Sequence, residues 1–104
     1  MNLKYEETLQ SFRLYSDEEP QKWLEEYDIH GLYTGLNEKG EIVYFEKELF
    51  GNLMKTFKLL DNIVHEINPE GLYTVPELGL KDVPFYKVIE AIKERFLENL
   101  KVKA

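Results

Sequence analysis

The sequence contains no cysteine, which excludes disulfide bridges, thiolate zinc sites, iron–sulfur clusters and cysteine nucleophiles. This absence is typical of proteins in a reducing compartment. The longest unbroken apolar run is Ile42-Val43-Tyr44-Phe45, much too short to span a bilayer. Acidic residues begin at Glu6, so the amino terminus does not resemble a signal peptide. We therefore expect a cytoplasmic protein without a membrane partner.

Positive charge is scarce, since 13 lysines and arginines stand against 20 acidic residues and give a formal net charge of −7. The excess lies in residues 1–28, which hold eight acidic and three basic residues, whereas the last 36 residues hold six of each. A protein that binds nucleic acid directly needs clustered lysine and arginine side chains against the phosphates. No such cluster occurs, so we expect no direct nucleic-acid binding. The acidic amino-terminal third could instead attract a basic protein, although solubility is the simpler explanation.

The length of the chain sets the domain number. A chain of 104 residues has room for one hydrophobic core, so we expect 1–104 to form a single domain. Apolar residues make up 43% and charged residues 32% of the sequence, as in ordinary globular proteins, which argues against disorder.

The amino-terminal part is predicted to form two helices. Residues 3–15 place apolar side chains at three- or four-residue intervals, with charged and polar residues between them. These apolar residues are Tyr5, Leu9 and Phe12. Ser16 and Glu19 then have the spacing of a capping box, and Pro20 is tolerated in a first helical turn. We expect a second helix over about 16–27.

The rest of the chain alternates between strand and helix patterns. Two β-rich runs flank the turn residues Asn37-Glu38-Lys39-Gly40 and predict a β-hairpin over 31–45. A sustained helical spacing of apolar residues predicts a long helix over 46–67. A short strand at 72–75 and an amphipathic helix after Pro84 complete the prediction.

These elements predict an α+β domain in the order α-α-β-β-α-β-α. Its small antiparallel or mixed sheet would hold about three strands, namely the 31–45 hairpin and strand 72–75, packed against four helices. The tetrapeptide Gly-Leu-Tyr-Thr occurs twice, at 31–34 and 71–74. Duplication and chance explain this repeat about equally well. In either case we expect its two tyrosines on neighbouring strands.

No arrangement of side chains points to catalysis. Ser11 and Ser16 are the only serines, and both are explained by a helix surface and a cap; no glycine-rich phosphate loop occurs. Asp61 and His65 are four residues apart on one expected helix face, but no third ligand completes a metal-binding pattern. We therefore expect no enzymatic activity, no cofactor and no metal.

Aromatic residues are the more informative feature, because seven tyrosines and one tryptophan cannot all be buried in so small a domain. Exposed Tyr and Trp beside charges are common in protein interfaces, although half-buried rings at element borders are the simpler explanation. The leading hypothesis is a small acidic protein-binding module, such as an inhibitor, an immunity or antitoxin-like protein, or a regulatory protein. Its expected binding residues are Asp17, Glu18, Glu19, Trp23, Glu26 and Tyr27.

Two alternatives stay open. A homodimer could form if the open edges of a small sheet, or the seam of the long helix, pair with a second copy. A small ligand or substrate could instead bind at the proline-bracketed loop over 76–84, because binding residues are often placed on loops. In that loop Leu78 and Leu80 could equally pack as plugs into the core.

Overall fold

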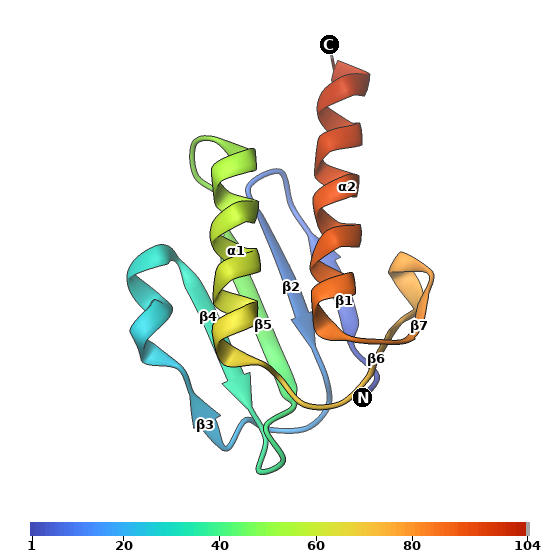
Figure 1. Cartoon of the computed structure of the whole chain (residues 1–104). Helices are drawn as coiled ribbons and strands as arrows, with labels where there is room; N and C mark the ends of the chain where they lie inside the picture. The colour runs from blue at the N-terminus through green and yellow to red at the C-terminus, as the bar shows by residue number, and fades with distance from the viewer. Residues whose placement is uncertain (104) are drawn as a thin grey trace.

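A five-stranded antiparallel sheet is covered on one face by two helices, with α1 over the β4–β5 half and α2 over the β1–β2 half (Figure 1). The computed structural model describes residues 1–103, and the exposure of side chains through residue 100. The strand order is β1-β2-β5-β4-β3. The strands are β1 (Lys4–Glu7), β2 (Ser11–Tyr15), β3 (Lys22–Trp23), β4 (Leu32–Leu36) and β5 (Ile42–Glu48). The helices are α1 (Leu53–Ile67) and α2 (Phe85–Lys103).

A smaller antiparallel sheet joins the two helices. It consists of β6 (Tyr73–Val75) and β7 (Leu80–Val83), with the short 3-10 helix η2 (Pro76–Leu78) between them. A second 3-10 helix, η1 (Glu25–His30), precedes β4. The fold class is therefore α+β as expected, but the main sheet has five strands where three were predicted, and two α-helices replace four.

The helix predicted over 3–15 is wrong, because these residues form the β1–β2 hairpin. Alternate residues of β1 and β2 point into the core, so Tyr5 faces Leu14 and both are buried. Leu9, which the helical pattern placed beside Phe12, lies in the turn with 82% of its surface exposed. The helical spacing of Tyr5, Leu9 and Phe12 is a coincidence, because the three residues lie in β1, in the turn and in β2.

The helix predicted over 16–27 is also wrong. Ser16 Oγ accepts a hydrogen bond from the Glu18 N–H at 3.1 Å, which closes a local turn and starts no helix. The same side chain–backbone hydrogen bonds serve turns and helix caps alike. The chain then runs through Pro20 into the two-residue strand β3 and the 3-10 helix η1.

The remaining elements are found where they were predicted, with changed bounds or partners. The hairpin is confirmed, but β5 runs on to Glu48. Helix α1 begins only after its N-cap Asn52, whose side chain accepts a hydrogen bond from the Lys55 N–H at 3.2 Å. The short strand and the last helix are confirmed. Strand β6 pairs with β7 and not with the hairpin, so Tyr33 and Tyr73 do not lie on neighbouring strands as expected.

The core lies between the main sheet and the two helices and is rich in aromatic rings. Phe12 is central, because its ring centroid lies 6.2 Å from that of Phe45 and 6.4 Å from that of Phe57. Phe85 at the start of α2 packs on Phe45 at 5.0 Å and on Tyr73 at 5.2 Å. These contacts join both sheets and both helices to one cluster.

A lysine is buried on the core side of β5. Lys47 is 3% exposed, and its Nζ donates hydrogen bonds to the carbonyls of His30 at 2.7 Å and Glu48 at 2.5 Å. Burial lowers the pKa of Lys47. These two carbonyls belong to the last residues of η1 and β5. The Lys47 ammonium group therefore links η1 to the end of β5.

One edge of the main sheet is covered by the smaller sheet and η2. The outward N–H of Tyr5 in β1 donates a hydrogen bond to the Glu77 carboxylate at 2.5 Å. The Thr74 carbonyl accepts from the Leu3 N–H, and the Thr74 N–H donates to the Met1 carbonyl, each at 2.9 Å. The smaller sheet and η2 therefore occupy part of the β1 edge, one of the open sheet edges on which the homodimer alternative depended. The opposite edge is the two-residue strand β3.

Glu7 fastens strand β1 to helix α2. Arg95 donates two hydrogen bonds to Glu7 Oε1, at 2.5 and 3.2 Å, and the Tyr5 hydroxyl donates to Glu7 Oε2 at 2.8 Å. Above all, the hydrogen bonds from Arg95 hold the pKa of Glu7 below its usual range.

This contact predicts a pH-dependent contribution to stability. A carboxylate with a lowered folded-state pKa stabilises the fold above its unfolded-state pKa of about 4.3, and this contribution is lost as the pH falls through the folded-state value. We expect Glu7→Gln to lower the free energy of unfolding by about 1 kcal/mol near neutral pH, and by much less at a pH of about 3. Urea denaturation at both pH values measures the difference; an equal loss at both would contradict the assignment.

Candidate functional site

The face of the main sheet that the helices leave uncovered carries aromatic and charged side chains. Alternation along each strand points them away from the core. This open face consists of Lys4, Glu6, Ser11, Arg13, Tyr15, Trp23, Tyr33, Tyr44, Glu46 and Glu48. The sheet register arranges most of these residues in two rows that cross the strands.

The first row is aromatic. Tyr15 of β2 pairs with Tyr44 of β5, Tyr44 pairs with Gly35 of β4, and Gly35 pairs with Trp23 of β3. A Cβ at Gly35 would lie 2.7 Å from atoms of Pro20 and 3.4 Å from Trp23. Because glycine leaves this space free, the Trp23 ring lies over β4 and meets the edge of the Tyr44 ring, with centroids 5.4 Å apart.

The second row is charged and consists of Glu6 of β1, Arg13 of β2 and Glu46 of β5. Each of these side chains has a hydrogen-bond partner on the open face. Arg13 donates to Glu6 and lies over the Tyr15 ring, 4.7 Å from the centroid. The Tyr15 hydroxyl donates to Glu6 at 2.7 Å, and the Tyr44 hydroxyl donates to Glu46. The bond to Glu6 raises the pKa of Tyr15, while burial and the bond to Glu46 raise that of Tyr44. The aromatic row is thus held in place by the charged row.

Four of the six residues expected to bind a partner lie at or beside the open face. Trp23 belongs to the aromatic row. Asp17, Glu18 and Glu19 are exposed in the loop between β2 and β3. Asp17 lies 3.5 Å from Lys4 of the open face, and Glu18 accepts a hydrogen bond from the Asn37 amide at 3.1 Å.

The other two expected residues are placed on η1. The Tyr27 ring packs against the core, and its hydroxyl donates to Glu66 of α1 at 3.0 Å, so this side chain lies on the helix-covered side of the sheet. Glu26 is exposed on the same 3-10 helix. The six residues therefore do not form one surface, because the helix expected to align them does not exist.

Sequence reasoning missed the rest of the open face. The alternation in Ser11-Phe12-Arg13-Leu14-Tyr15 was the available signal, because period two places Arg13 and Tyr15 opposite the buried Phe12 and Leu14. Tyr44 follows from the same alternation in β5. Their pairing with Trp23 depends on strand order, which the sequence does not reveal.

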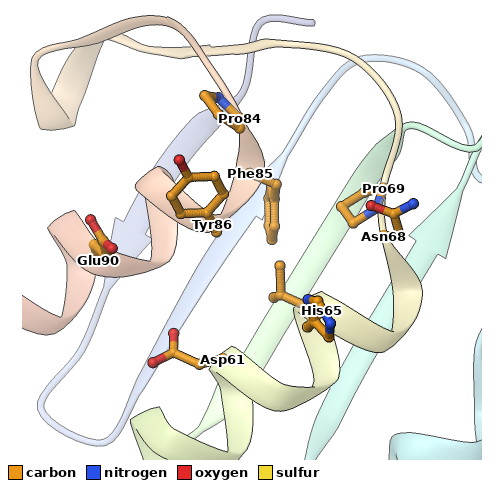
Figure 2. Close-up of a pocket in the computed structure, with 9 residues that line it drawn as sticks. Asp61, His65, Asn68, Pro69, Pro84, Phe85, Tyr86 and Glu90 are labelled. Carbon is orange, nitrogen blue, oxygen red and sulfur yellow. The ribbon is translucent and has the colours of Figure 1, made fainter.

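A pocket lies between the carboxyl end of α1 and the amino end of α2 (Figure 2). It has a volume of about 390 Å³. Of the loop over 76–84 that was considered as a ligand site, only Pro84 lines it. Leu78 and Leu80 of that loop pack against the core. Across the described residues, no three His, Asp or Glu side chains lie close enough together to hold a metal ion.

Neither of the two described α-helices is both long and apolar enough to cross a membrane. Comparisons with known protein families, with curated protein sequences and with solved structures found no match.

Proposed function

We propose that this chain is a non-catalytic protein-binding module that holds a basic partner on the open face of its sheet, as an inhibitor or regulatory protein does. The observation that carries this proposal is the aromatic row, an ordered line of Trp and Tyr side chains on a face that no helix covers.

The aromatic row has the properties of an interface anchor. Trp and Tyr dominate the binding energy of many protein interfaces because they bury a large area at a low cost in conformational entropy. Trp23 is 49% exposed, so about half of its surface is available to a partner. Its contact with Tyr44 and the hydrogen bond from Tyr44 to Glu46 hold both rings before binding, which lowers the entropic cost of association.

The charge around the row favours a basic partner. The open face holds three acidic and two basic residues, and the adjoining loop adds Asp17, Glu18 and Glu19. Arg13 is already paired with Glu6, whereas Glu48 has no ion pair within the described part of the chain. The acidic side chains around the aromatic row would attract the lysine and arginine side chains of a partner. These side chains would then contact the Trp and Tyr rings by cation–π interaction.

A titration with an octa-arginine peptide, followed by amide NMR shifts, tests the proposal without knowledge of the partner. We expect shifts at β2, β3 and β5, and binding that weakens on raising the salt concentration from about 50 to about 300 mM. Trp23→Ala should weaken binding roughly tenfold. Met54→Ala, which removes a 54% exposed side chain from α1, is the control and should leave it unchanged.

Salt-independent binding, or shifts confined to the helices, would contradict the proposal. An octa-glutamate peptide should cause no shifts. The natural partner is then identified by capture from the source cells with the wild-type chain as bait. A partner of the open face is retained by the Met54→Ala chain and lost with the Trp23→Ala chain.

A further inference from the structure

We propose that the pocket between α1 and α2 is a binding site for a small organic cation, an amine carried on an aromatic or apolar body. This site is separate from the open face, because it is built from helix residues on the covered side of the sheet (Figure 1). Its volume of about 390 Å³ lies within the range of small-molecule sites.

The floor of the pocket is apolar and held in place. Val64 of α1 and Phe85 of α2 form it, and both belong to the buried core. Pro69 and Pro84 also line the pocket, and their rings fix the backbone φ angle at these positions. The turn after α1 is also fixed, since the Asn68 N–H donates to the Val64 carbonyl at 2.9 Å. An apolar ligand body would therefore meet a surface that needs no rearrangement.

The rim of the pocket brings negative charge from two helices to one place. Asp61 and His65 lie one turn apart on α1, and Figure 2 shows them across the pocket from Tyr86 and Glu90 of α2. Within residues 1–100, Asp61 and His65 have no side-chain hydrogen bond or ion pair, and Glu90 pairs only with Lys87, at 3.5 Å. Two carboxylates and a tyrosine ring are groups that recognise an ammonium ion. Lys87 already makes such contacts at the outer side of the rim, because its Nζ lies 5.5 Å from the centroid of the Tyr86 ring and 3.5 Å from Glu90.

The charges decide against an anion. The amino end of α2 carries roughly half a positive charge from its helix dipole, which favours an anion. Asp61 and Glu90 supply two acidic side chains to the lining, whereas the one lysine beside them, Lys87, pairs with Glu90 and is not part of the lining, so the formal charge of the rim is negative.

The geometry also decides against a metal ion. Asp61, His65 and Glu90 share the rim, yet they are not close enough together to hold one. A ligand that reaches both carboxylates must be larger than a single ion, and the apolar floor selects a body of carbon atoms.

Three probes of similar shape but different charge test whether the pocket recognises a cation. They are cationic 2-phenylethylamine, neutral 2-phenylethanol and anionic phenylacetate, each titrated while amide NMR shifts are followed. We expect the amine to cause saturable amide shifts in residues 61–69 and 84–90. The alcohol should bind at least about tenfold more weakly, and the acid should not bind measurably. Equal binding of all three, or shifts outside this pocket, would overturn the proposal.

Variants of the rim test the assigned residues. Asp61→Asn and Glu90→Gln should each weaken amine binding several-fold, while Glu94→Gln, an exposed residue one turn further along α2, should not. Because all three side chains are exposed, the variants keep the fold, which their amide spectra verify. Unchanged affinity in both rim variants would refute the site. Trp23→Ala should leave amine binding intact, so failure here is independent of the open face.

Discussion

Replacement of Phe12 by alanine is expected to lower the free energy of unfolding by about 3–5 kcal/mol, which is much of the stability of a domain of this size. The Phe12 ring contacts those of Tyr5, Phe45, Phe57 and Phe96, with centroids between 6.2 and 6.5 Å away. It joins three strands to both helices. Removal would leave a cavity that the surrounding rigid rings cannot fill.

Leu9→Ala is the matched control for Phe12→Ala. Leu9 is 82% exposed in the β1–β2 turn, so its removal should change the free energy of unfolding by less than about 0.5 kcal/mol. A helix over 3–15 would place both residues on one buried face and make both changes costly. Urea denaturation of the two variants therefore separates hairpin from helix; two similar losses would contradict the hairpin.

Tyr73→Phe is expected to lower the free energy of unfolding by about 1–3 kcal/mol, although only one oxygen atom is removed. The Tyr73 hydroxyl accepts a hydrogen bond from the Ile42 N–H and donates one to the Glu70 carbonyl, each at 2.8 Å. Since Tyr73 is fully buried, phenylalanine would leave the Ile42 N–H without a partner inside the core. The expected loss of stability therefore comes from a buried backbone N–H without a hydrogen bond, and not from poorer packing.

Tyr86→Phe, at a 51% exposed position, is the control and should cost almost nothing. A second signature distinguishes the hydroxyl from packing. Burial raises the pKa of Tyr73 to about 12. The neutral phenol therefore contributes stability below about pH 10, and this is lost as the pH rises from there through about 12. The stability gap between wild type and Tyr73→Phe should narrow over that range; a constant gap would argue against the hydroxyl.

The elements that could be predicted are those with strong local signals. The 31–45 hairpin has its turn residues between two β-rich runs, and the last helix has a regular apolar face. The amino-terminal hairpin could not be found in the same way. Its apolar spacing fits both the helix and the strand period, and the structure is decided by the pairing of β2 with β5, whose partners lie 29 to 37 residues further along the chain.

The candidate site was predicted only in part for the same reason. Trp23 could be selected as a large aromatic residue in an acidic segment. Its partner Tyr44, and the role of Gly35 between them, depend on the strand order β5-β4-β3. The interhelical pocket likewise needs the ends of α1 and α2 to meet, although Asp61 and His65 already suggested a shared helix face.

The covered edge of β1 has a consequence for synthesis. Strands β1, β2 and β5 can pair once residue 48 has left the ribosome, but the Tyr5 N–H finds its acceptor only in Glu77, 72 positions further along the chain. For a period on the order of seconds, a nascent chain would expose a sheet edge that other chains can join. A chain cut before residue 77 would keep that edge open permanently, so truncation there should favour aggregation.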